Sequence, residues 1–218
     1  MADIRRISVQ EAVHGENDRI AEGVRANLTP RRIFMVNVMG APGAGKTSTI
    51  VSTVRHFQEN RPYVVEGDIE SDLDARTMRA LGIETIQINT GGACHLDAPL
   101  VAAAVEELSL DAKGILFIEN IGNLVCPAEF TIGEHAILLV STVTEGSDKP
   151  YKYPLAFEKA SAVVLNKCDL LPYVDFDEAF FLKGLRALNP AAPVFKVSSR
   201  TGEGFAELAA WLESRARA

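Results

Sequence analysis

The residues with the clearest chemical role form a glycine-rich segment, Gly40-Ala-Pro-Gly-Ala-Gly-Lys-Thr47. This segment fills every fixed position of the phosphate-binding loop G-x-x-x-x-G-K-[ST], in which backbone N–H groups surround the phosphates of a nucleotide. Lys46 places a positive charge at the outer phosphates, and Thr47 offers its hydroxyl to a magnesium ion. The motif predicts a nucleoside triphosphate site whose nucleotide-binding residues are Gly40, Gly43, Ala44, Gly45, Lys46, Thr47 and Ser48.

An Asn-Lys-x-Asp motif further along the chain predicts which base is bound. Asp169 can accept hydrogen bonds from the ring N–H and the exocyclic amine of guanine, a pair of donors that adenine lacks. Asn166 can meet the Hoogsteen edge of the base, and the stem of Lys167 can lie over its plane. The segment that begins at Ser198 is expected to close over the base. We therefore predict guanine, and we interpret Cys168, inside the motif, as a small packed residue.

Carboxylates that follow predicted strands lie between these two motifs. Asp68 and Asp72 come after the second strand, where they can bind magnesium or its waters and orient the attacking water. Glu119 ends a later strand and is the candidate second carboxylate near magnesium, with a solvated acid as the alternative. Lys149 and Lys152 either add charge to the phosphates or a partner subunit, or lie in a solvated loop. The predicted catalytic residues, for in-line attack of water on the γ-phosphate, are Lys46, Asp68, Asp72 and Glu119.

A second set of side chains has the chemistry of a softer metal site. Cys94 and His95 are adjacent on one predicted loop, and Cys126 lies seven residues after Glu119 on another. Two thiolates and one imidazole suit Zn(II) or Ni(II), and three ligands leave a position for water, a second chain or transfer to a client. The spacing by itself leaves two alternatives open, a metal site and ordinary packing of cysteine and histidine side chains.

Short apolar runs predict the elements that position these residues. The run 33–39 predicts a buried parallel strand, followed by a helix over 47–57 whose amino terminus faces the phosphates. Helical stretches alternate with most of the later strands, which indicates a mostly parallel sheet with helices on both faces and ligands at the carboxyl ends of its strands. We therefore predict the three-layer α/β/α fold of P-loop NTPases. The later strands are expected at 63–66, 85–89, 114–119, 135–140, 162–166 and 193–197.

The chain is long enough for one α/β domain. Residues 8–28 have helical spacing, and the segment 28–32, which contains Pro30, ends that helix before the first strand. We predict an N-terminal helical appendage over residues 1–30 and a P-loop GTPase domain, which also carries the metal site, over residues 31–218. In the last predicted helix we expect the core anchors to be Phe205, Leu208 and either Trp211 or Leu212.

Composition restricts the partners and the location. The net charge of −7 gives no basic footprint for nucleic acid. No apolar stretch approaches the roughly 18 residues that cross a bilayer, and the first residues lack the apolar core of a secretion signal. We therefore expect a cytoplasmic protein that binds neither nucleic acid nor a membrane. The three cysteines argue against a disulfide framework and leave thiols free for metal or for burial.

Five segments together resemble one family of P-loop proteins. The combination is similar to the GTPase that inserts nickel during maturation of [NiFe]-hydrogenase, the HypB family of SIMIBI-class P-loop GTPases, from about residue 15 to the end. The adjacent Cys-His pair separates this family from the related urease accessory GTPase, which carries Cys-Pro-His. The segments are the phosphate loop, Glu66-Gly-Asp-Ile-Glu-Ser-Asp-Leu-Asp-Ala75, Thr90-Gly-Gly-Ala-Cys-His-Leu-Asp97, Glu119-Asn-Ile-Gly-Asn-Leu-Val-Cys-Pro127 and Asn166-Lys-Cys-Asp-Leu170.

The resemblance implies GTP hydrolysis coupled to nickel insertion and a homodimer favoured by GTP. It places nickel or zinc at Cys94, His95 and Cys126, near the dimer interface. It also implies a nickel-binding maturation partner and the precursor of the hydrogenase large subunit as partners. In contrast to some relatives, this sequence has no histidine-rich tract and no cysteine motif near its N-terminus, since only His14 precedes the core, so we do not expect high-affinity nickel storage.

The short tether between Glu119 and Cys126 suggests how the two sites communicate. Loss of the γ-phosphate near Glu119 should disturb metal bound at Cys126, so that hydrolysis times metal delivery. Two other functions remain compatible with the sequence. One is an accessory GTPase for another metalloenzyme, such as urease or a cobalamin-dependent mutase, and the other is a GTPase switch without metal chemistry.

Overall fold

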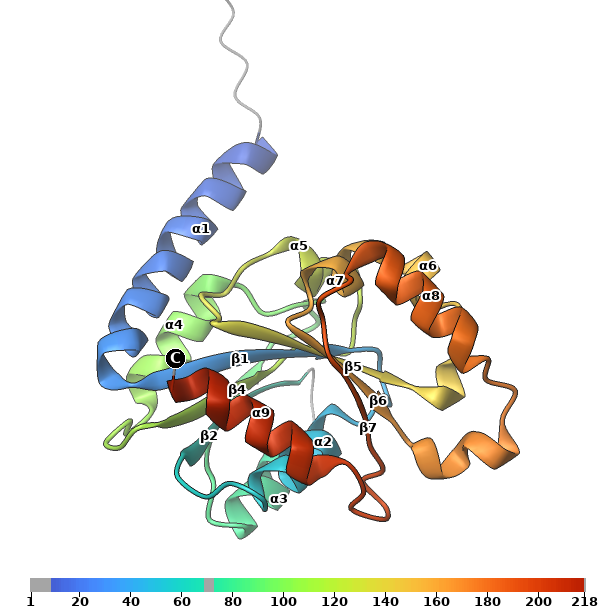
Figure 1. Cartoon of the computed structure of the whole chain (residues 1–218). Helices are drawn as coiled ribbons and strands as arrows, with labels where there is room; N and C mark the ends of the chain where they lie inside the picture. The colour runs from blue at the N-terminus through green and yellow to red at the C-terminus, as the bar shows by residue number, and fades with distance from the viewer. Residues whose placement is uncertain (1–8, 69–72, 218) are drawn as a thin grey trace, which may run out of the picture.

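The computed structural model describes residues 9–68 and 73–217, and its centre is a parallel sheet (Figure 1). Within the described residues the sheet has seven strands in the order β3-β2-β4-β1-β5-β6-β7, and every neighbouring pair is parallel. The strands are β1 (Ile33–Gly40), β2 (Arg61–Asp68), β3 (Glu84–Asn89), β4 (Gly114–Glu119), β5 (Ala136–Thr142), β6 (Ala162–Asn166) and β7 (Val194–Lys196).

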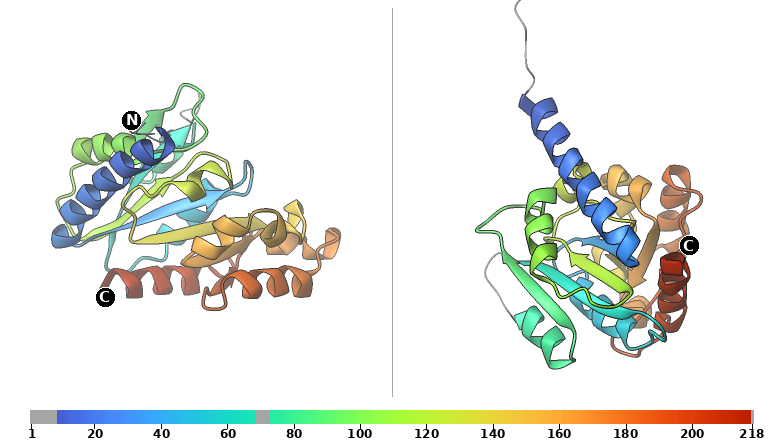
Figure 2. Two further views of the ribbon diagram at one scale, coloured as in Figure 1. Left: turned by 90° about the horizontal axis from the view of Figure 1, so that it is seen from above. Right: turned by 90° about the vertical axis from the view of Figure 1, so that its left-hand side faces the viewer.

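Helices cover both faces of this sheet. In the view from above, α1 and α4 lie on one side of the strands and α9 lies on the other (Figure 2). None of the helices that the structure describes is both long and apolar enough to cross a membrane. The α-helices are α1 (Val9–Leu28), α2 (Lys46–Val54), α3 (Leu73–Ala80), α4 (Ala98–Glu107), α5 (Cys126–Glu129), α6 (Lys149–Lys152), α7 (Pro154–Lys159), α8 (Glu178–Leu188) and α9 (Phe205–Arg217). Short 3-10 helices are η1 (Thr29–Arg31), η2 (Val143–Glu145) and η3 (Cys168–Tyr173).

The alternation of side chains along the central strand explains the three layers. In β1, Val36 and Val38 belong to a core shared with α2 and α9, whereas Ile33 and Met35 belong to a core shared with α1 and α4. Successive strand residues point to opposite faces, and a strand buried on both faces has apolar residues at nearly every position. The run 33–39 has this composition because helices pack on both faces of the strand that it forms. The predicted three-layer fold is confirmed.

Most predicted boundaries hold within two residues, and the helix after the phosphate loop differs most. We predicted that it runs to residue 57, but α2 ends at Val54. The next N–H groups, those of His56 and Phe57, donate to the carbonyls of Thr53 and Val54, three residues back. Such bonds tighten the last turn of a helix into 3-10 geometry. At the other end of the chain, Leu208 and Leu212 of α9 are buried as expected, and Trp211 packs against the same core.

Candidate nucleotide and metal site

The phosphate loop connects β1 to α2, and its glycines are required by conformation and by close contacts. Gly43 and Gly45 have φ angles of 75° and 91°, in the left-handed region that side chains disfavour. A Cβ atom at Gly40 would lie 2.5 Å from the carbonyl oxygen of Val140 in β5, and one at Gly45 would lie 2.5 Å from Nδ2 of Asn166. The phosphate loop therefore packs closely against the ends of β5 and β6, and β6 leads into the Asn-Lys-x-Asp motif.

The Asn-Lys-x-Asp motif, hereafter the base motif, donates hydrogen bonds to the phosphate loop although the two are far apart in the sequence. Asn166 Nδ2 donates to the carbonyl of Ala44 at 3.1 Å, and Lys167 Nζ donates to the carbonyl of Gly43 at 2.8 Å. Asn166 is buried at the end of β6, so its amide is fixed by this contact. Contact of Asn166 with the Hoogsteen edge stays a prediction. Two segments that lie more than 100 residues apart thus form one continuous surface.

Ser198 orients the carboxylate that we assign to guanine. Its hydroxyl donates to Asp169 Oδ1 at 2.7 Å and accepts the backbone N–H of Thr201 at 3.2 Å. Ser198 is fully buried, and the guanidinium of Arg200 lies 4.0 Å from Asp169 Oδ2 in solvent. Cys168 beside it donates to the carbonyl of Leu165, and burial raises the pKa of its thiol, as expected for a packed side chain.

Thr47, in the first turn of α2, comes together with Glu119, the last residue of β4. The Thr47 hydroxyl donates to Glu119 Oε1 at 2.8 Å, and Glu119 is buried at the carboxyl end of β4. Hydroxyl and carboxylate oxygens are ligands that magnesium prefers, so this pair fits the ion. The side chain of Asp68, which ends β2, lies outside the described residues, and so does all of Asp72.

Glu145 is an acid of this region that the sequence analysis did not single out. It lies in η2, after β5, and burial raises its pKa, while the charges of Lys149, Lys167 and Lys46 act in the opposite direction. Among the described residues, neither of its carboxylate oxygens has a hydrogen-bond partner. The available signal was its position, an acid directly after a predicted strand at the carboxyl edge of the sheet.

The two lysines near this acid differ in their surroundings. The ammonium group of Lys149 lies 5.3 Å from the centroid of the Tyr153 ring and near Glu145. Lys152 forms an exposed ion pair of 2.5 Å with Asp148. The surroundings of Lys152 are therefore those of a solvated helix, whereas Lys149 lies toward the buried acid.

The three candidate metal ligands come together from the loop after β3 and from the first residue of α5. One ligand atom from each of Cys94, His95 and Cys126 lies within 4.8 Å of the other two, and Cys94 Sγ is 3.5 Å from His95 Nδ1. A hydrogen bond with the Cys126 thiol raises the pKa of Cys94, and partial burial adds to this effect. Two adjacent thiols resist joint deprotonation unless a cation compensates their charge. The donor set therefore fits a divalent metal of borderline softness.

An aromatic stack supports the imidazole of this set. The ring of Phe130 lies 4.4 Å from that of His95, with an angle of 21° between the planes. The same Phe130 ring stacks on His14 of α1, at a centroid distance of 4.6 Å. The orientation of His95 is therefore linked by packing to the N-terminal helix.

The segment between Glu119 and Cys126 contacts both sites. Asn123 forms an antiparallel bridge with Gly40 of the phosphate loop, and a Cβ atom at Gly122 would lie 3.0 Å from Pro42. The Asn123 side chain also donates to the carbonyl of Cys94 at 3.2 Å and accepts the N–H of Val125 at 2.9 Å. The sequence predicted a short tether here, but no local pattern indicated that its middle touches the phosphate loop.

Known proteins share both the sequence and the fold. Residues 34–196 match the family model of the CobW/HypB/UreG nucleotide-binding domain. Hydrogenase maturation factor HypB of Azotobacter chroococcum mcd 1 is 44% identical over 214 residues, which cover 98% of this chain and 70% of that protein. HypB from Helicobacter pylori, solved in complex with nickel, has a TM-score of 0.88 and 32% identity, covering 93% of this chain and 95% of that one. The cell division protein FtsY of Thermotoga maritima, at 18% identity, shares the fold, with a TM-score of 0.55 over 81% of this chain and 68% of that one.

Proposed function

The chain belongs to the CobW/HypB/UreG family, within its HypB group, and on this premise we propose that it couples hydrolysis of GTP to nickel insertion during [NiFe]-hydrogenase maturation. The observation that carries this proposal is the contact of one segment, 119–126, with both the phosphate loop and the Cys94, His95 and Cys126 cluster. A protein with these two sites joined in this way can let the state of the nucleotide set its affinity for the metal.

For the GTP site we propose that Asp169, oriented by Ser198, selects guanine, and that the amides of the loop and Lys46 bind the phosphates. Magnesium, when bound, neutralises charge on the β- and γ-phosphates. Thr47 and Glu119 are its proposed protein ligands, because their oxygens already lie 2.8 Å apart. Asp68 and Asp72 remain the proposed acids that complete this shell and orient the attacking water.

For the cargo site we propose that nickel binds to Cys94, His95 and Cys126, with zinc as the competing metal. Three ligands leave a position open, which suits transfer of the ion to or from a partner. The proposed partners are a nickel-binding maturation protein and the precursor of the hydrogenase large subunit. The cluster includes the exposed Cys94, which supports access by such partners.

We also propose a homodimer that GTP favours. Exposed apolar side chains, Val125 beside Cys126 and Tyr173 after the base motif, are 51% and 82% accessible and offer contacts for a second copy. The proposed organisation of the chain is a helical appendage over residues 1–30 on a GTPase domain over 31–218, in a cytoplasmic protein. Light scattering with GDP and with a non-hydrolysable GTP analogue tests the dimer, which should form mainly with the analogue.

The three cysteines provide a matched test of the metal site. Cys94→Ser and Cys126→Ser together should abolish nickel binding in equilibrium dialysis and leave GDP binding intact. Cys168→Ser is the control, because the Cys168 thiol packs against the Leu165 carbonyl, away from the cluster. This variant should bind nickel like the wild type. Full nickel affinity in the double variant would exclude the assignment, and a wild-type protein that bound no metal would favour a GTPase switch without metal chemistry.

A further inference from the structure

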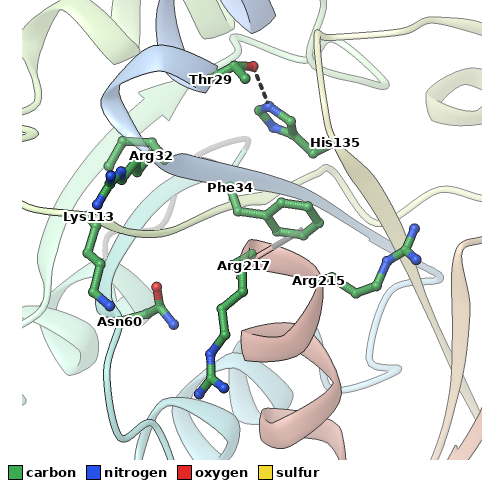
Figure 3. Close-up of a pocket in the computed structure, with 10 residues that line it drawn as sticks. Thr29, Arg32, Phe34, Asn60, Lys113, His135, Arg215 and Arg217 are labelled. Atoms are coloured by element: carbon green, nitrogen blue, oxygen red, sulfur yellow. Dashed lines mark hydrogen bonds between the residues drawn. The ribbon is translucent and has the colours of Figure 1, made fainter.

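A cavity of about 500 Å³ lies at the edge of the sheet opposite the nucleotide site (Figure 3). Ile33 and Phe34, the first two residues of β1, form part of its wall, together with the last turn of α9. The phosphate loop follows the other end of this eight-residue strand. Since a strand rises about 3.3 Å per residue, roughly 23 Å separates the two places. The cavity is therefore distinct from the GTP and metal sites.

Positive charge is concentrated around this cavity, although the chain has a net charge of −7. Four cationic side chains from three segments line it, and its described lining includes no aspartate or glutamate: they are Arg32, Lys113, Arg215 and Arg217. Lys113 and Arg217 both pair with the nearby Glu59, at 3.4 Å and 2.9 Å. For Arg32 and Arg215, the described part of the chain provides no ion pair or side-chain hydrogen bond. Two guanidinium groups at one cavity are thus uncompensated.

Phe34 adds an aromatic surface beside these charges. Its ring is half-buried and lies 5.3 Å from the ring of His135. His135 Nδ1 accepts the backbone N–H of Met35, so its proton is on Nε2, which donates to the hydroxyl of Thr29. Burial and the charge of Arg25 lower the pKa of His135, in agreement with a neutral imidazole. The wall around Phe34 is therefore uncharged, and the cationic groups form its rim (Figure 3).

We propose that this cavity binds a small phosphorylated molecule that carries a planar group, with the phosphates on Arg32 and Arg215 and the ring against Phe34. Planar guanidinium groups match phosphate oxygens in pairs, and they also stack on flat rings. A volume of about 500 Å³ is within the range of small-molecule sites, which is roughly 300–1,000 Å³. Glu59, which does not line the cavity, already pairs with Lys113 and Arg217, so Arg32 and Arg215 are the lining cations left for the phosphates.

Adenosine diphosphate is a suitable probe, because it carries phosphates and a ring but does not match the guanine motif. The full chain is first saturated with fluorescent GDP and magnesium, and calorimetry then measures binding of added ADP. The expected result is one further binding site, with the GDP fluorescence unchanged. Loss of the GDP signal on addition of ADP, or no additional binding, would overturn the proposal.

Variants assign the additional site to the cavity. Arg32→Gln combined with Arg215→Gln should weaken ADP binding by about tenfold or more, because two charge-assisted contacts are lost. Arg55→Gln, an exposed arginine at the end of α2 that does not line the cavity, is the matched control and should bind ADP like the wild type. GDP binding and the unfolding temperature should be unchanged in both variants. Equal ADP affinity in the double variant would exclude this site.

Two further ligands test the ring and the class of ligand. Phe34→Leu should reduce binding of ADP but not of inorganic tripolyphosphate, which has charge without a ring. Equal loss for both ligands would overturn the role of the aromatic wall. A glutamate-rich peptide should bind more weakly than ADP. Tighter binding of the peptide, lost in the arginine double variant, would replace the proposed small molecule with an acidic protein partner.

Discussion

Asn123 is the residue whose removal tests the connection between the two sites most selectively. Its backbone bridges Gly40 of the phosphate loop, and its side chain donates to the carbonyl of Cys94. It is neither a proposed metal ligand nor a proposed nucleotide ligand. In Asn123→Ala the backbone bridge remains, whereas the contact with the Cys94 loop and the turn that leads to Cys126 are lost. We expect both ligands still to bind but their mutual influence to decrease.

The expected magnitude follows from two hydrogen bonds. The Asn123 side chain makes one bond of 3.2 Å to the Cys94 carbonyl and one of 2.9 Å with the N–H of Val125, both partly exposed to solvent. A hydrogen bond of this kind contributes about 0.5–1 kcal/mol net, so about 1–2 kcal/mol of coupling depends on the pair. Since 1.4 kcal/mol corresponds to a factor of ten, the ratio of nickel affinities between the nucleotide states should decrease about 5- to 30-fold, or to unity if the wild-type ratio is smaller.

Equilibrium dialysis of nickel, with GDP and with a non-hydrolysable GTP analogue, measures this ratio for each variant. Asn89→Ala is the matched control, because Asn89 accepts the N–H of Gly91 on the same metal loop but, among the residues that the structure describes, has no hydrogen bond to the phosphate loop. The control should keep the wild-type ratio. An Asn123→Ala protein with an unchanged ratio would refute the reasoning, and so would an equal decrease in the control.

Three other changes give distinct outcomes. Ser198→Ala removes a charge-assisted bond to Asp169, which should weaken GDP binding about 10- to 100-fold in fluorescence titrations, and unchanged affinity would contradict this role. Asp169→Asn presents a donor to the N–H groups of guanine, so GDP binding should fall by about 100-fold or more while xanthosine diphosphate binds better, and a retained preference for GDP would exclude the assignment. Burial holds the folded-state pKa of Glu145 above its ordinary value of 4.5, so its ionisation costs stability as pH rises. As pH rises above about 4.5, the unfolding temperature of the wild type should therefore fall relative to that of Glu145→Gln, and a constant difference would contradict the effect.

The strands and the positions of the candidate metal and phosphate residues could be predicted because their signals are local. Parallel strands covered on both faces appear as continuous apolar runs, and β4 and β6 match the predicted ranges 114–119 and 162–166. The carboxyl ends of these strands share one edge of the sheet. The rule that places Lys46, Glu119 and Cys126 at that edge needs no knowledge of side-chain contacts.

What the sequence did not reveal depends on contacts between distant segments. The bridge between Asn123 and Gly40 and the burial of Glu145 arise only when the loops at the edge of the sheet pack together. The cationic cavity combines Arg32 and Arg215, which are far apart in a chain whose overall charge is negative. The predicted end of α2 was wrong because the last turn of a helix is decided by competing backbone hydrogen bonds, which the helical periodicity of the sequence does not reveal.

The central claim, that the nucleotide controls the metal site, is tested most directly by the nickel affinity of the wild-type protein in its two nucleotide states. The account predicts tighter binding with a non-hydrolysable GTP analogue and magnesium than with GDP and magnesium, and by linkage nickel must raise affinity for the analogue over GDP by the same factor. Equal nickel affinities in the two states would contradict the claim and would leave a metal site that is independent of the GTPase.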